Sequence, residues 1–410
     1  MTAGRADLPL LFATRGVRMF AYGVLGVVLV LYLTACGLSE AGVGLLLTLT
    51  LLGDAAISLG LSTRADRWGR RRTLAAGAGL MLLGGWVMAA TGDFTVLALA
   101  ATIGVISPTG SEVGPFLAVE QACLAQVIAD RDRTRVFAWY NVAGFIATAL
   151  GAVTGGVVAE ALQRAGWGAL GSYRALFVAY GVLGGIIGMM SLRLGAAVEA
   201  PPAAETAAGG AARPWLGLTQ SRGIVRRLSG LFALDAFGGG FILQSFLVYW
   251  FHRKFGVGEA ALGTLFFGTN LLSGLSALAA VPLARRIGLV NTMVWTHLPS
   301  NLLLMLVPFM PTYGWAVGVL LVRHVISQMD VPTRQSYVNA VVPPAERSAA
   351  NGVTGTARQL GASLAPVLAG PLLGSAALAA APFLVSGALK IIYDLLLWRN
   401  FRRTKPPEEA

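Results

Sequence analysis

Charged residues are scarce in this 410-residue chain. Asp, Glu, Lys and Arg together account for 12% of the positions, whereas an ordinary soluble domain carries about 25%. Hydrophobic residues reach 56%, and the mean hydropathy is +0.69. The core of a water-soluble domain does not need so much apolar surface. The composition therefore argues against a soluble protein and predicts one embedded in a membrane.

Cysteine and histidine are also rare, with two and three copies in the chain. Cys36 falls at the outer end of one predicted helix and Cys123 in the inner half of another, so we interpret them as packing residues rather than as a disulfide. The histidines are too far apart for the ligand patterns of a metal site. A phosphate-cradling loop and a nucleophile motif are both missing. These absences argue against an enzyme, an ATP-driven pump, a metal site or a bound cofactor.

Long apolar runs dominate what is present, and each can cross a hydrocarbon layer of about 30 Å as an α-helix. The run at 94–128 contains SPTGSEVGP (107–115), which predicts a kink or a break in that helix. The pattern predicts an all-α integral membrane protein with twelve transmembrane helices. The predicted spans are 11–35, 41–62, 73–91, 94–128, 136–160, 173–194, 230–251, 260–284, 289–309, 314–341, 348–373 and 376–398.

The net charge of +12 follows from this topology. With both termini in the cytoplasm, most Lys and Arg residues between the spans fall on the cytoplasmic side, as the positive-inside rule requires. A nucleic-acid partner is therefore not needed to explain the charge. We expect a multi-pass monomer in the cell (inner) membrane, surrounded by the lipid bilayer.

The two halves of the chain repeat each other. GLSEAGVG (37–44) aligns with GVGEAALG (256–263), and the same offset carries ADRWG (65–69) onto ARRIG (284–288). A stretch rich in Ala, Pro and Gly at 195–214 separates them. Such a repeat predicts a transporter with its site near the bilayer midplane, between two pseudo-symmetric six-helix bundles. The expected parts are a first bundle at 1–194, a cytoplasmic linker at 195–229, and a second bundle with a cytoplasmic tail at 230–410.

One loop concentrates charge: STRADRWGRRRTL (62–74). It resembles the signature G-x-x-x-D-R/K-x-G-R-R/K that members of the major facilitator superfamily carry between their second and third helices, although Ser62 stands at the first glycine. The matching residues are Asp66, Arg67, Gly69, Arg70 and Arg71. Arginines here can anchor the loop at anionic headgroups. The resemblance further implies a gating loop that holds the cytoplasmic ends of the two halves together in the outward-open state.

A second motif is partial. GAVTGG (151–156) is similar to the G-P-x-x-G-G signature that many drug/proton antiporters carry on their fifth helix, with Ala152 in place of proline. Small residues at this spacing also let helices approach closely. An antiporter-like role and plain helix packing therefore both stay open.

Charged or histidine side chains within the spans are site candidates because they are costly in lipid. The resemblance implies that the first, fourth, seventh and tenth helices line a central cavity. The candidates on those helices are Arg15, Arg18, Glu112, Glu120, Asp235, Arg323, His324, Asp330 and Arg334. They can contact substrate or a proton, or form salt bridges that close the cytoplasmic end. Lys390 and Asp394, four residues apart, are interpreted as a structural pair.

Two of these carboxyl groups, Glu112 and Asp330, lie closer to the predicted midplane than Arg15, Arg18 and Asp235 do. A carboxyl group in an apolar cavity can bind and release protons near neutral pH, because desolvation disfavours its charged form. Asp54 is a further candidate. Glu120 and Arg334 are related by the repeat, and their opposite charges predict a pair between the halves.

Three functions are consistent with the sequence. The first is export of a small organic molecule driven by the proton gradient. The second is uptake of a polar or anionic solute by symport, which the cavity arginines favour. The third is a membrane sensor or scaffold that no longer transports, although charges retained in lipid argue against it.

The gating interpretation makes a direct prediction. Asp66→Asn removes one charge and little volume, so it should leave folding and membrane insertion intact while slowing transport. Transport rates in reconstituted vesicles, measured at equal protein content, test this. A variant that moves substrate at the wild-type rate would remove the gating role of Asp66.

Overall fold

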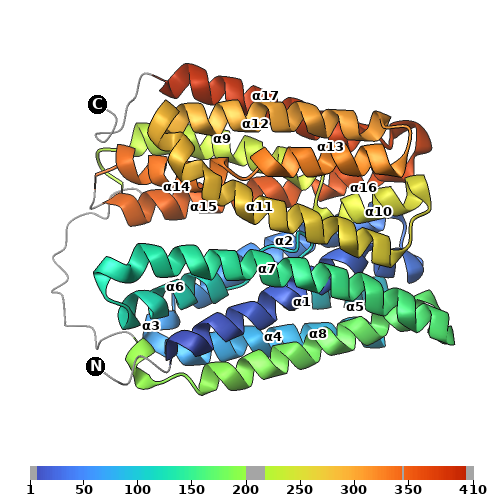
Figure 1. Ribbon diagram of the computed structural model, residues 1–410. Helices are drawn as coiled ribbons and strands as arrows, with labels where there is room; N and C mark the ends of the chain where they lie inside the picture. Colours follow the sequence, from blue (N-terminus) through green and yellow to red (C-terminus); the bar gives the residue numbers. More distant parts are fainter. Residues whose placement is uncertain (1–6, 200–217, 344–345, 403–410) are drawn as a thin grey trace. The chain divides into compact units, whose positions relative to one another are not determined.

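The computed structural model describes residues 7–199, 218–343 and 346–402 of the chain. Within these ranges the regular structure is helical and no strand occurs (Figure 1). Most of the predicted linker lies outside the described residues. By the contacts between its residues, the chain divides into two compact units, which we call unit 1 (Met1–Thr206 with Leu243–Asn270) and unit 2 (Ala207–Ile242 with Leu271–Ala410). The division of the chain at residues 195–229 remains a prediction.

Unit 1 contains the helices of the first part of the chain and two later segments. Its elements are α1 (Asp7–Ala35), α2 (Glu40–Ser62), α3 (Ala65–Trp68), α4 (Arg70–Ala90), α5 (Phe94–Ile103), α6 (Phe116–Val127), α7 (Asp130–Leu162), α8 (Gly168–Leu192), α10 (Gln244–Phe255) and the first part of α11 (Glu259–Ile287).

Unit 2 contains α9 and the helices that follow α11. Its elements are α9 (Arg222–Gly240), the rest of α11, α12 (Leu289–Leu306), α13 (Tyr313–Ile326), α14 (Asp330–Val341), α15 (Arg347–Leu364), α16 (Pro366–Gly374) and α17 (Ala381–Phe401).

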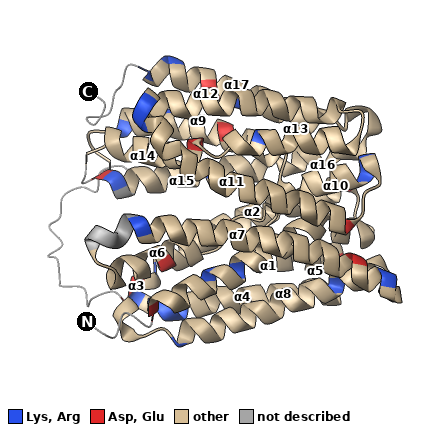
Figure 2. Ribbon diagram, viewed as in Figure 1, with Lys and Arg blue, Asp and Glu red and all other residues tan. Residues whose placement is uncertain are grey.

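Each predicted span overlaps one or two helices, which confirms the fold class. In the described part of the chain, seven helical stretches are long and apolar enough to cross a membrane. Large apolar side chains such as Leu83 and Met189 are more than half exposed, as lipid-facing positions require. Figure 2 shows that charged residues are sparse along the helices of either unit.

Several spans are interrupted. The predicted break at 107–115 is confirmed, since α5 ends at Ile103 and α6 begins at Phe116. Three spans that we predicted as continuous are also divided, at residues 241–243, at residues 327–329 and at Ala365. Their signals are weaker, such as three successive glycines before the first break and Pro366 after the last. A non-helical backbone at membrane depth is tolerated only where protein or water satisfies its polar groups.

Glycines bring α1 and α7 into close contact in unit 1. A Cβ atom on Gly151 would lie 2.0 Å from the carbonyl oxygen of Phe20, and one on Gly23 would lie 2.2 Å from that of Thr148. The GAVTGG motif therefore acts here as a helix-packing surface. In unit 2 a Cβ on Gly361 of α15 would lie 2.3 Å from the carbonyl oxygen of Ala233 on α9, so the corresponding helix pair approaches in the same way.

The carboxylate of Glu346 caps the start of α9 in unit 2. It accepts N–H bonds from Thr219 at 2.7 Å, Gln220 at 2.8 Å and Ser221 at 3.0 Å, and hydroxyl bonds from Thr219 and Ser221. Donors that favour the ionised form hold the pKa of Glu346 well below its ordinary value.

The α1–α7 contact predicts that Gly151→Ala destabilises the protein, because its Cβ would press on a backbone oxygen that cannot move aside. Overpacking of this kind costs about 1–3 kcal/mol. Gly79→Ala on α4 is the matched control, since no atom lies within 4 Å of its added Cβ. Thermal unfolding of the purified variants compares them, and equal unfolding temperatures would contradict the close approach.

The Glu346 cap predicts a pH-dependent effect of Glu346→Gln. The folded pKa is depressed, so the stabilisation is complete above the unfolded value of about 4.3 and is lost as the pH falls through the folded pKa. The variant should therefore unfold at a lower temperature than wild type at neutral pH, and the difference should shrink in acid. A difference that stays constant from about pH 7 to pH 3 would show that the carboxylate charge is not responsible.

Candidate functional site

Unit 1 holds a buried cluster of two arginines and two glutamates, here called the unit 1 cluster. Arg18 Nη1 and Nη2 bind the two carboxylate oxygens of Glu120 at 2.7 Å and 2.6 Å. Arg18 Nε binds Glu112 at 2.7 Å, and Arg15 Nη1 binds the other oxygen of Glu112 at 2.8 Å. Bidentate arginine–carboxylate pairs are strong and strict in their geometry. The sequence predicted all four residues as site candidates, and the structure brings them together.

Uncharged side chains complete the unit 1 cluster. Thr14 Oγ1 donates to Glu120 at 3.1 Å, and the Tyr140 hydroxyl donates to the same carboxylate. The guanidinium of Arg15 also lies over the Tyr140 ring, 4.3 Å from its centroid. We did not identify Tyr140 from the sequence, because a tyrosine in an apolar helix carries no charge signal.

Glu112 differs from Glu120 in its setting. It lies on the non-helical segment 104–115 between α5 and α6, and its side chain is 13% exposed, against 1% for Glu120. Asp54 holds this segment, because its carboxylate accepts the N–H of Gly114 and a 3.4 Å bond from Ser58. Among the residues that the structure describes, Asp54 has no basic partner within ion-pair distance.

Unit 2 holds a second buried cluster, the unit 2 cluster. Asp235 is its centre: Lys390 Nζ lies 2.8 Å from one oxygen and Arg334 Nη1 lies 3.3 Å from the other. Arg334 Nη1 also binds Asp330 at 2.9 Å, one helical turn before it on α14. The predicted candidates Asp235, Asp330 and Arg334 therefore meet in one network.

A histidine–aspartate pair extends the unit 2 cluster. His297 Nδ1 lies 2.9 Å from Asp394 Oδ1, and the Asn301 amide donates to Asp394 Oδ2 at 3.1 Å. The interpretation of Lys390 and Asp394 as partners of each other is wrong, because Lys390 binds Asp235 and Asp394 binds His297. Their spacing along the chain could not reveal partners on other helices.

The predicted pairing of Glu120 with Arg334 stays a prediction. Glu120 is bound by Arg18 in unit 1, and Arg334 is bound by Asp235 and Asp330 in unit 2. Both residues are therefore neutralised by partners within their own units, which the repeat relation alone could not show.

Arg323 and His324 lie at the end of α13, outside the ion pairs of the unit 2 cluster. His324 Nδ1 lies 2.7 Å from the carbonyl oxygen of Leu320, so this nitrogen carries the proton and donates. The other ring nitrogen, Nε2, is left as an acceptor that faces Arg323 Nη1 at 3.4 Å. His324 is thus a neutral hydrogen-bonding partner in this structure.

The predicted gating loop forms α3 and the start of α4. Asp66 binds Arg70 Nε at 2.8 Å, and Gly69 between them has φ of +104°, a conformation that side chains rarely adopt. Arg70 also donates to the carbonyl oxygens of Ala122 at 3.2 Å and Val198 at 3.0 Å. The loop is therefore hydrogen-bonded to α6 and to the residues that follow α8.

Glu199 was missed by the sequence reasoning because it lies in a stretch that we interpreted as linker. Its carboxylate accepts the N–H of Arg70 at 2.6 Å and that of Arg71 at 3.3 Å, at the start of α4. A negative charge is favoured at this end of a helix. Arg67 is exposed, and the Arg71 guanidinium donates to the carbonyl oxygen of Leu192.

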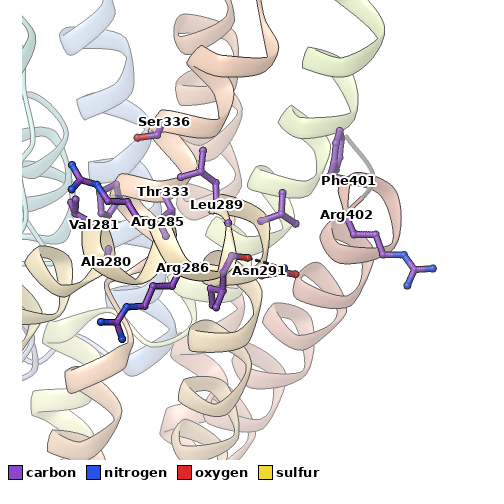
Figure 3. Close-up of a pocket in the computed structure, with 15 residues that line it drawn as sticks. Ala280, Val281, Arg285, Arg286, Leu289, Asn291, Thr333, Ser336, Phe401 and Arg402 are labelled. Carbon is purple, nitrogen blue, oxygen red and sulfur yellow. Dashed lines mark hydrogen bonds between the residues drawn. The ribbon is translucent and has the colours of Figure 1, made fainter. Parts of the chain in front are cut away.

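A pocket of about 620 Å³ lies elsewhere in unit 2, at the ends of α11 and α17, the start of α12 and the first part of α14. Arg285, Arg286 and Arg402 line it without any acidic residue. Their side chains point in different directions (Figure 3). None of the residues of the unit 2 cluster lines this pocket, so it is separate from the buried charges. In the described part of the chain, no group of three or more His, Cys, Asp or Glu residues could hold a metal ion.

Comparison with solved structures shows a shared fold. The nucleoside transporter NupG superimposes with a TM-score of 0.72 and 14% identity, covering 98% of this chain and 100% of NupG. A D-xylose-proton symporter gives a TM-score of 0.71 and 14% identity, covering 96% of this chain and 97% of the symporter.

Sequence comparison assigns the family. The uncharacterized membrane protein YJR124C of Saccharomyces cerevisiae is 30% identical over 417 residues, which cover 95% of this chain and 93% of the yeast protein. The sequence model of the Major Facilitator Superfamily matches residues 11–366 and 229–410. The chain therefore belongs to the major facilitator superfamily, whose members are transporters rather than enzymes.

Proposed function

We propose that this transporter exports a small organic solute in exchange for protons. It acts as a monomer in the cell (inner) membrane, with both termini in the cytoplasm and the proton gradient as its energy source. The observation that carries the proposal is the position of Glu112, a carboxylate shared by two buried arginines at the break in the fourth span.

Glu112 is suited to exchange an ion pair for a proton. It is the more exposed glutamate of the unit 1 cluster, so water can reach it more readily than Glu120. Protonation of Glu112 would remove the charge that neutralises Arg15, whereas Arg18 would still be neutralised by Glu120. An uncompensated buried charge costs about 3–5 kcal/mol, and 1.4 kcal/mol already changes an equilibrium tenfold. Proton binding at Glu112 can therefore shift the balance between two conformations.

Export is favoured over uptake by the partial antiporter-like motif at 151–156, although its glycines also serve helix packing. The alternative, uptake of a polar or anionic solute, was favoured by the four arginines predicted to line the cavity. Of these, Arg15, Arg18 and Arg334 are already bound by carboxylates, so they are weaker support for it than the sequence suggested. Buried ion pairs alone could also serve a scaffold, but the partial exposure of Glu112 suits a group that exchanges protons and is not needed for packing.

The proposal predicts that Glu112→Gln abolishes transport driven by a pH gradient and spares exchange of solute for solute. Everted membrane vesicles that contain the protein are energised, and a pH-sensitive dye reports the loss of the gradient when each compound of a solute panel is added. Wild type should respond to a transported compound, and Glu112→Gln should not.

Glu120→Gln is the contrasting variant. Because Glu120 is bound bidentately and is only 1% exposed, its loss should impair gradient-driven transport and exchange alike. A Glu112→Gln variant that still dissipates the gradient at the wild-type rate would exclude Glu112 as the proton site.

A further inference from the structure

Arg323 is a buried cation without an ion pair. The buried Lys and Arg side chains of the described residues are Arg15, Arg18, Arg70, Arg323, Arg334 and Lys390. All of them except Arg323 bind a carboxylate, at 2.6–3.3 Å. Arg323 is 8% exposed, and its Nε has no hydrogen-bond partner within the described part of the chain.

The acid whose charge acts on Arg323 is already engaged. Asp330 influences Arg323 electrostatically, but its carboxylate is bound by Arg334 Nη1 at 2.9 Å. The 3.4 Å contact with His324 Nε2 brings a neutral acceptor and no negative charge. An arginine removed from water without a counter-charge is costly, so a purely structural role does not account for this placement.

Ser327 supplies a second unsatisfied group at the same place. It follows Arg323 by four residues, so the two side chains share one face at the end of α13. It is 4% exposed, and its hydroxyl has no hydrogen-bond partner among the described residues. Ser327 lies at the break between α13 and α14, at residues 327–329, and Arg323 lies one helical turn before it.

We propose that Arg323 and Ser327 form an anion subsite for the transported solute, which therefore carries a carboxylate or phosphate group. This inference rests on the proposed function, since it names the class of the solute. A guanidinium presents its N–H groups in a planar fork that matches the oxygens of such an anion, and the serine hydroxyl adds a further donor. His324 accepts from Nη1 of Arg323, and the Nε–H of Arg323 has no partner among the described residues.

The other cations are less suited to this role. Arg18 and Arg334 would have to release a carboxylate before they could bind an anion. The arginines of the 620 Å³ pocket are exposed, so water would compete with an anion there. A cationic solute would add to the uncompensated charge of Arg323 and is disfavoured.

Thermal unfolding of the full-length protein in detergent tests the subsite at constant ionic strength. The probes are matched pairs of an anion and its neutral counterpart: gluconate and glucose, benzoate and benzyl alcohol, and glycerol 3-phosphate and glycerol. At least one anion should raise the unfolding temperature of wild type while its neutral counterpart does not, because a ligand that binds only the folded state stabilises it. If no anion of the panel does so, the proposal is wrong.

Arg323→Met should need a roughly tenfold or higher anion concentration to give the same rise in unfolding temperature. Ser327→Ala should need a smaller increase in anion concentration. Arg402→Met is the control in the exposed pocket and should bind as wild type does. If Arg402→Met abolishes the effect and Arg323→Met does not, the anion binds in the pocket and the proposed subsite is wrong.

The stability of the variants without any anion separates binding from structure. Arg323→Met removes an uncompensated charge, so its unfolding temperature should equal or exceed that of wild type, whereas Arg334→Met should unfold at a lower temperature. A loss of stability in Arg323→Met as large as that in Arg334→Met would overturn the proposal. These measurements need no proton gradient. A negative result for anion binding therefore does not affect the test of proton coupling at Glu112, and a negative result for proton coupling does not affect the test of anion binding.

Discussion

Neutralisation of buried charge is the constraint on which the rest of this structure depends. The interior of either unit is apolar, and a lone charge there would cost several kcal/mol. Both carboxylate oxygens of Glu120 therefore bind the guanidinium of Arg18, and Asp235 binds Lys390 through one oxygen and Arg334 through the other. Because the partners come from different helices, these ion pairs also fix how the helices of each unit pack.

Close helix contact makes such pairing possible. Glycines on α1 and α7, and on α9 and α15, let backbones approach to distances that a Cβ atom would prevent. The arginines of α1 bind Glu120 on α6 and Glu112 in the segment before it. An interrupted span also places one of these partners. Glu112 lies in the non-helical segment between α5 and α6, and Asp54 fixes the backbone of that segment by accepting the N–H of Gly114.

Departures from full neutralisation mark the positions with a function to explain. Glu112 has partners but is partly exposed, which suits a group that exchanges a proton. Arg323 is buried but has no carboxylate partner, which suits a group that binds an anion. Glu112 lies in the break between α5 and α6, where the backbone lacks the regular hydrogen bonds of a helix, and Arg323 lies in α13 one turn before the next such break.

The sequence by itself determined the membrane class, the positions of the spans and the family. These depend on the length of apolar runs, on charge at their ends and on a loop motif, all of which are local properties. It also marked the candidate residues, because any charge within an apolar span is unusual. It did not identify Tyr140, Glu199 or the His297–Asp394 pair, whose side chains become informative only beside their partners.

Only the tertiary structure decided which charge meets which. Lys390 and Asp394 are neighbours along one helix, and yet they bind Asp235 and His297 on two others. Whether Arg323 is compensated was likewise invisible in the sequence, since Asp330 follows it by seven residues and could have been its partner. The physical reason is that an ion pair forms over about 3 Å in space, and helix packing, which depends on contacts distant in the chain, sets those distances.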